Sequence, residues 1–161
     1  MFTRILVPSD GSAVSRLAAE AAIDLAQACG AGIVALSIVV PDAPLLVEGG
    51  LVPDPGQHEE DLLERAHGVV DALERSALRA GVDCKPVTRI APDASQAIVL
   101  AASDYACDLI VMGSHGRRGL SRLLAGSVTQ EVLASATVPV MVFRPARPDE
   151  QTHTGAVDDL A

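Results

Sequence analysis

Apolar and polar positions along the chain form blocks that predict strands and helices in turn. Continuous apolar runs that are rich in β-branched residues predict buried strands, because the strands of a parallel sheet are covered on both faces. Such runs span residues 3–9, 32–40, 107–113 and 138–143, and a weaker strand pattern spans 83–91. Apolar residues recur at helical spacing over 12–29, about 57–80, 93–105 and 127 to about 134. Strand and helix are therefore predicted to alternate along the chain.

This alternation predicts the α/β fold class: a doubly wound, open parallel five-stranded sheet with helices on both faces. Right-handed crossovers leave few topologies, of which we expect the strand order 3-2-1-4-5. In that order the first and fourth strands lie side by side where the winding reverses, and ligands bind beyond their carboxyl ends. The two strands end in "LVPSDGS" and "IVMGSHG", where apolar residues give way to small polar ones. These two segments are therefore the expected binding site.

Length and composition fit one domain with one core, because 49% of the 161 residues are hydrophobic. We expect a single domain over 1–145 and a flexible acidic tail over 146–161. Residues 41–56 hold four prolines and three glycines, which predicts a long loop.

The net charge of −9 argues against nucleic-acid and anionic-membrane partners. No CxxC pair, secretory signal or apolar stretch of membrane-spanning length is present, so we expect a cytoplasmic protein.

One glycine-rich stretch opposes the acidic character of the chain. It reads "VMGSHGRRGLSRLLAGSVTQEV" over residues 111–132, with three arginines and no acid between Gly113 and Gly126. Glycines before a helix start are typical of a phosphate site. The GxxxxGK[ST] loop is excluded, because the only lysine of the chain is Lys85, and GxGxxG is absent after the first strand. The pattern that remains is Gly113-x2-Gly116-x9-Gly126-Ser127.

That pattern resembles the ATP-binding signature of the universal stress protein family. The resemblance covers nearly the whole chain, through "ILVPSDGS", "DLIVMGSHG", "GSVTQEVL" and "VPVMVF". It implies a protein that binds ATP, with Mg²⁺ as the expected metal, and that forms a homodimer through its last strand, 138–143. It also implies a regulatory role in the stress response with a protein partner still to be identified.

The resemblance implies a role for individual residues. Pro8 and Asp10 match the turn after the first strand, where the aspartate lies near the ribose or a phosphate-bound metal. The main chain of Ile38 or Val39 meets adenine, and Met112 lies beside the nucleotide. The remaining matches, which lie beside the nucleotide or bind phosphate and ribose, are Gly113, Gly116, Gly126, Ser127, Val128 and Thr129. Ile90 departs from the family, which often has glycine there, and is expected to narrow the pocket wall.

The physical chemistry of these residues leaves alternatives. Amides at Gly113 and Gly116 can converge on phosphate, and we expect a valine at Gly113 to damage the site because it fills space and resists a positive φ. Ser127 starts a helix whose dipole favours negative charge, but with Gln130 it also fits a capping box. Asp10 is equally a candidate helix cap. The chain has no Trp, one Tyr and two Phe, so adenine is expected to pack against apolar side chains.

Three functions are compatible with this chemistry. The favoured one is a nucleotide-dependent regulatory module, and the alternatives are a slow ATPase or phosphotransferase and a structural dimer without nucleotide. Catalysis is disfavoured because no second carboxylate, lysine or evident base accompanies Asp10, although His115 lies nearby. Arg117 and Arg118 are candidates for phosphate contact or for solvated charges. A receiver domain and a PP-loop enzyme are disfavoured, because the acidic cluster of the first and the glycine-serine loop of the second are missing.

Overall fold

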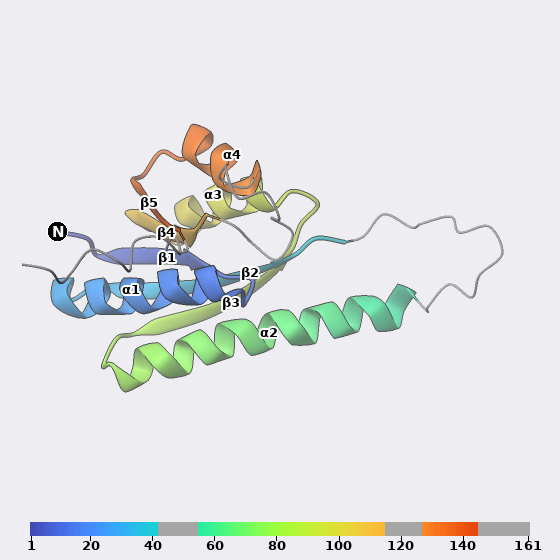
Figure 1. Ribbon diagram of the computed structural model, residues 1–161, viewed down its shortest axis with the longest axis horizontal. Coiled ribbons are helices and arrows are strands. Elements are labelled where there is room, and N and C mark those ends of the chain that lie inside the picture. The colour runs from blue at the N-terminus through green and yellow to red at the C-terminus, as the bar shows by residue number, and fades with distance from the viewer. Residues whose placement is uncertain (42–54, 115–126, 145–161) are drawn as a thin grey trace, which may run out of the picture.

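Strands and helices alternate throughout the computed structural model, which describes residues 1–41, 55–114 and 127–144 (Figure 1). The strands are β1 (Arg4–Pro8), β2 (Gly32–Val39), β3 (Cys84–Ile90), β4 (Leu109–Gly113) and β5 (Val140–Phe143). The helices are α1 (Ala13–Cys29), α2 (Pro55–Arg79), α3 (Ala94–Asp104) and α4 (Ser127–Ser135). Helix α2 begins two residues before the predicted start, and 42–54 of the predicted loop lie outside the described residues.

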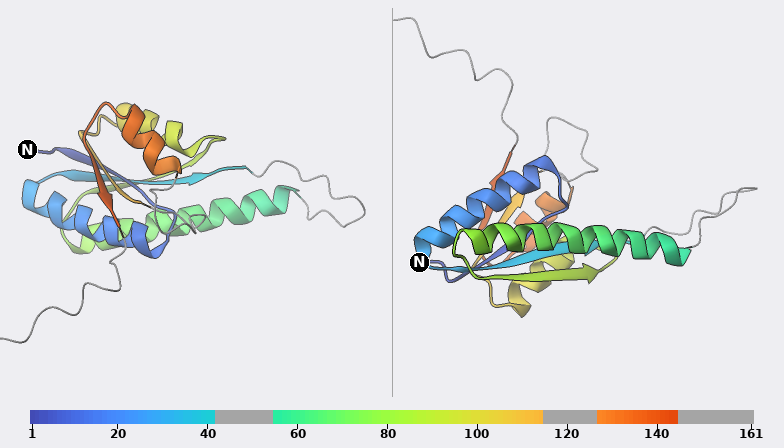
Figure 2. Two further views of the ribbon diagram at one scale, coloured as in Figure 1. Left: turned by 45° about the horizontal axis from the view of Figure 1, so that its top comes forward. Right: turned by 90° about the horizontal axis from the view of Figure 1, so that it is seen from below.

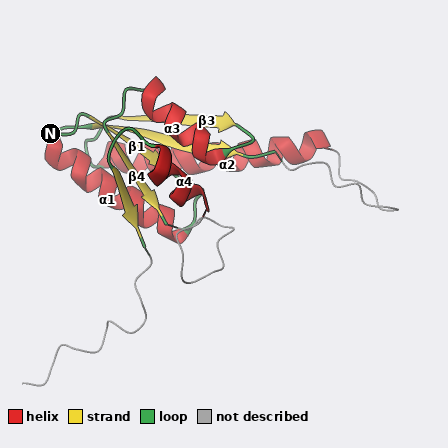
Figure 3. Cartoon of the chain, turned by 90° about the horizontal axis from the view of Figure 1, so that it is seen from above, coloured by secondary structure: helices red, strands yellow, loops and turns green. Residues whose placement is uncertain are grey.

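The strands form one parallel sheet in the order β3-β2-β1-β4-β5, which confirms the predicted fold class. Helices α1 and α2 cover one face of the sheet, and α3 and α4 cover the other (Figures 2 and 3). Strand β1 pairs with β2 on one side and β4 on the other, so the winding reverses between β1 and β4. No helix within the described ranges is long and apolar enough to cross a membrane.

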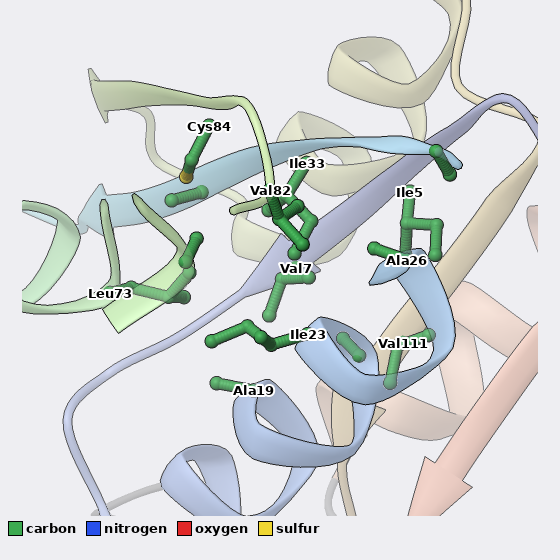
Figure 4. Close-up of a cluster of buried hydrophobic side chains, with 14 of the residues drawn as sticks. Ile5, Val7, Ala19, Ile23, Ala26, Ile33, Leu73, Val82, Cys84 and Val111 are labelled. Atoms are coloured by element: carbon green, nitrogen blue, oxygen red, sulfur yellow. The ribbon is translucent and has the colours of Figure 1, made fainter. Parts of the chain in front are cut away.

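The core has two layers because alternate residues of the buried strands point to opposite faces. On β1, Ile5 and Val7 pack beneath α1 and α2, whereas Leu6 packs beneath α3 and α4. The first layer is shown in Figure 4, where Ile23 of α1 and Leu73 of α2 approach the sheet. Burial on both faces explains why the strands are continuous apolar runs in the sequence.

Helix ends follow the local chemistry of the chain. The Ser12 hydroxyl accepts the Ser15 N–H at 3.2 Å at the start of α1, and Gly30 ends that helix with φ of 69°. Asp93 caps α3 by accepting the N–H groups of Ser95 and Gln96. These caps fix where the helices begin and end, and the two at helix starts fix where the loops after β1 and β3 end.

Two of the cysteines lie in the core, as expected of small apolar residues. Cys84 and Cys107 are buried, and this burial raises the pKa of each thiol to about 11. Both therefore stay protonated and unreactive near neutral pH.

Candidate functional site

A cavity of about 430 Å³ lies beyond the carboxyl ends of β1, β2 and β4, where the fold is expected to bind a ligand. The predicted site residues that line it are Pro8, Asp10, Ile38, Val39, Met112, Gly113, Ser127, Val128 and Thr129. The structure thus brings together residues from three strand ends and one helix start. The predicted residues Gly116 and Gly126 lie outside the described residues, as do His115 and the three arginines between them.

The turn after β1 is held by its own side chains. Oδ1 of Asp10 accepts the N–H of Ser12 at 3.0 Å, and the backbone of Gly11 has φ of 75°. Arg16 donates from Nη1 to the carbonyl oxygen of Gly11 at 2.6 Å. Since Ser12 is the residue that caps α1, Asp10 shapes the preceding turn and also lines the cavity.

The first turn of α4 is fastened to the end of β4. Oγ1 of Thr129 lies 3.2 Å from the carbonyl oxygen of Gly113 and 3.3 Å from that of Ser114, and both carbonyls accept from the hydroxyl. Ser114 in turn donates its N–H to the carbonyl of Phe143 at 2.7 Å. The Thr129 hydroxyl therefore holds the start of α4 in place. An anion at this end of the cavity is favoured by the amino-terminal dipole of α4.

Two sequence-based expectations about this region are wrong. The glycines with positive φ among the described residues are Gly11, Gly30 and Gly81, so Gly113 is not required for its backbone angle. Ile90 does not line the cavity; it is 48% exposed at the end of β3. Strand β3 is the outermost strand on its side of the sheet, which places Ile90 away from the β1–β4 junction.

The wall formed by α2 was not predicted as part of the site. Leu62, Arg65, Ala66 and Val69 line the cavity at helical spacing. The apolar members belong to a stripe that the sequence identifies only as core-facing, and Arg65 looks in the sequence like any exposed helix residue. Their placement depends on how far α2 extends beyond the sheet, which only the assembled fold reveals.

Few charged groups line the cavity. Asp10 is the one carboxylate and Arg65 the one cation among its described lining residues. The described residues contain no cluster of three or more His, Cys, Asp or Glu side chains that would hold a metal ion. Asp10 therefore fits Mg²⁺ only as a single ligand beside phosphate oxygens and water, which is a common way of binding this ion.

A second cavity, of about 580 Å³, lies at the opposite end of the sheet. It is lined by residues around the amino ends of β1, β2 and β3, including Arg4, Asp83, Lys85 and Tyr105. This second cavity receives neither the turn after β1 nor the start of α4. The cavity at the carboxyl ends is therefore the better candidate site.

Curated relatives resemble the chain over most of its length. Universal stress protein MJ0531 of Methanocaldococcus jannaschii is 34% identical over 147 residues, which cover 89% of this chain and 83% of that protein. A universal stress protein of Thermus aquaticus is 35% identical over 89% of this chain and all of its own length. Universal stress protein Rv2005c of Mycobacterium tuberculosis is 34% identical, and the match spans 45% of that longer protein.

Solved structures share the fold. Protein MJ0577 of M. jannaschii superposes with a TM-score of 0.78 at 24% identity, covering 91% of this chain and 99% of that one. A universal stress family protein of Burkholderia pseudomallei gives 0.71 at 28% identity, covering 87% and 94%. More distant folds with TM-scores of 0.64 to 0.65 include universal stress proteins solved in complex with cAMP, with dAMP (Archaeoglobus fulgidus) and with AMP (Arabidopsis thaliana).

The family model described as the universal stress protein family matches residues 1–144. This match includes every described element from β1 to β5. The chain belongs to the universal stress protein family.

Proposed function

We propose that the chain binds ATP in the cavity at the carboxyl ends of β1, β2 and β4, and that it acts as a nucleotide-dependent regulatory module in the stress response. The observation that carries this proposal is the convergence on one cavity of the Asp10 turn, the end of β2 and the start of α4. Related folds solved with cAMP, dAMP and AMP support an adenine nucleotide as the ligand.

The two ends of the cavity suit the two ends of a nucleotide. Ile38, Val39 and Val40 give an apolar surface at the end of β2, which suits a purine base. Ser127 stands at the start of α4, where backbone N–H groups and the helix dipole favour phosphate. Asp10 would hold Mg²⁺ against the phosphates, where the ion would neutralise their charge.

We also propose a homodimer formed through β5. This strand pairs with β4 on one side, and no described strand pairs with its other edge. Unpaired strand edges are available for pairing with another chain. Because ATP is an intracellular metabolite, we place the proposed module in the cytoplasm.

Calorimetry with ATP and with adenosine tests the proposed nucleotide site. We expect ATP to bind more tightly, and a micromolar affinity corresponds to about −8 kcal/mol. Ser127→Asp should lower the affinity for ATP much more than that for adenosine, because the added carboxylate repels phosphate. The same carboxylate is favourable at a helix start, so the fold is retained. Ser127→Asn is the neutral control of similar size. A parent protein that binds neither ligand would overturn the proposal, and equal effects on both ligands would exclude phosphate at α4.

A further inference from the structure

Arg65 is placed differently from the other residues that line the cavity. It lies on the α2 wall among Leu62, Ala66 and Val69, and its side chain is exposed. Within the described residues it forms no ion pair. No aromatic side chain is among the described lining residues, so nothing there offers a flat ring to a bound base. Among the described lining residues, the guanidinium of Arg65 is thus the only flat cation.

The topology places Arg65 at the apolar end of the cavity. Helix α2 packs on β2 and β3, and its amino end extends past the carboxyl ends of these strands (Figures 1 and 2). Strand β1 separates β2 from β4, the strand that leads to α4. Adjacent strands lie about 4.8 Å apart, so the end of β2 is about 10 Å across the sheet from the end of β4. Arg65 therefore lies on the side of Ile38 and Val39, away from the phosphate end.

We propose that Arg65 is a base-contacting residue whose guanidinium stacks on the purine ring of the bound nucleotide; this rests on the nucleotide-binding function proposed above. A guanidinium is flat and weakly hydrated, and it stacks readily on aromatic faces. The base then lies between the apolar end of β2 and the Arg65 plane. Lysine carries the same charge but has no plane to stack on the base, so it replaces arginine only in part.

Affinities of Arg65 variants for adenosine and for ATP test this role. We expect Arg65→Lys and Arg65→Gln each to lower the affinity about 3- to 30-fold. For each variant this factor should be the same for adenosine and for ATP. Arg75→Lys is the matched control, because Arg75 is an exposed arginine of the same helix that does not line the cavity. At about 1.5 Å per residue it lies about 15 Å further along the helix axis, and its variant should bind like the parent. Thermal unfolding of each variant checks that the fold is retained.

Other outcomes overturn this assignment. Suppose that Arg65→Gln weakens the binding of ATP, that Arg65→Lys binds ATP like the parent, and that the affinity for adenosine is unchanged in both variants. Arg65 then contacts phosphate and not the base. If both variants bind both ligands like the parent, Arg65 contacts no nucleotide, although the proposed function stands. If the parent protein binds neither ligand, the proposed function fails and the role of Arg65 fails with it.

Discussion

Gly113 at the end of β4 lies against Val14 in the first turn of α1 so closely that no side chain fits between them. A β-carbon on Gly113 would lie 2.9 Å from Cγ1 of Val14 and 3.1 Å from the backbone nitrogen of Ser15. The glycine thus allows the start of α1 to pack on the end of β4. That contact brings the Asp10 turn and the β4 end to the same cavity, so Gly113 shapes the site through packing.

Gly113→Ala should therefore destabilise the whole domain. We expect a loss of about 1–3 kcal/mol in the free energy of unfolding, because the added methyl group meets backbone as well as side chain. Urea unfolding measures the loss. Gly68→Ala is the matched control: a β-carbon there meets nothing within 4 Å, and the change should stabilise α2 by up to about 1 kcal/mol. A Gly113→Ala protein as stable as the parent would contradict the packing role.

The same contact shows which features the sequence predicts and which it does not. Strand and helix patterns reflect local periodicity, so the sheet and its strand order were predictable from runs such as 32–40 and 107–113. The motif at the β4 end indicated a ligand site with no space for a side chain at Gly113, but not that α1 is what occupies this space. That packing depends on the distance to Val14, 99 residues earlier in the chain, which no local pattern encodes. Arg65 was missed for the same reason, because its place at the cavity depends on the projection of α2.

The hydroxyl of Ser95 joins α3 to α4 through Glu131. Oγ of Ser95 lies 2.7 Å from Oδ1 of Asp93 and 2.7 Å from Oε2 of Glu131. A hydroxyl has one proton and cannot donate fully to two carboxylates. Glu131→Gln supplies an amide that donates to Oγ, which leaves the hydroxyl proton for Asp93. We expect a gain of about 0.5–1.5 kcal/mol in unfolding free energy at neutral pH.

Two controls test whether that gain comes from the shared hydroxyl. In a Ser95→Ala background the Gln variant should bring no gain, because the oxygen that it would donate to is gone. Ser95→Ala by itself should destabilise the protein, since it removes a link between two helices that line the cavity. A gain of equal size in both backgrounds would assign the effect to surface charge alone.

Acid should weaken the attachment of the chain start to β4. Burial acts to raise the pKa of Asp108, but hydrogen bonds from the Thr3 N–H, the Thr3 hydroxyl and the Arg4 N–H outweigh it and hold that pKa below its ordinary value of 3.8. The Ser95 hydroxyl and the Gln96 N–H likewise lower the pKa of Asp93. A lowered folded-state pKa contributes stability that is present above the unfolded value and is lost as the pH falls through the folded value.

Unfolding midpoints in urea should accordingly decline as the pH falls below about 3.8. Asp108→Asn removes the titrating group but keeps its size, so this variant should be less stable than the parent at neutral pH. Its stability should also fall less on acidification. If the parent and the Asn variant decline in parallel, Asp108 does not contribute to acid sensitivity.

The proposed dimer depends on the outer edge of β5. Met141 in the middle of this strand is 40% exposed, whereas Val142 packs against the core beneath α3 and α4. Met141→Lys places a charge at the edge and should weaken dimerisation at least about tenfold, or about 1.4 kcal/mol. Sedimentation measures the effect. Leu78→Lys is the control, because Leu78 is 57% exposed on α2, which covers β2 and β3 at the other side of the sheet. A monomeric parent at high concentration would exclude the dimer.

Hydrolysis of bound ATP should be slow, below about 1 turnover per second. Among the described residues that line the cavity, Asp10 is the only carboxylate, and its Oδ1 already accepts the N–H of Ser12. Such a carboxylate would hold a metal ion against phosphates, but the described lining offers no second carboxylate and no histidine that would act as a base on an attacking water.

Single-turnover hydrolysis with Mg²⁺ distinguishes a binding module from an enzyme. Asp10→Asn is a matched substitution, because asparagine keeps the oxygen that accepts the Ser12 N–H and so preserves the turn. His115→Ala tests the histidine that the sequence places beside the glycine motif, in a segment outside the described residues. We expect a slow rate that His115→Ala leaves unchanged. Fast turnover that either substitution abolishes while ATP still binds would identify an enzyme, since the lost group would then act on the reaction and not on binding.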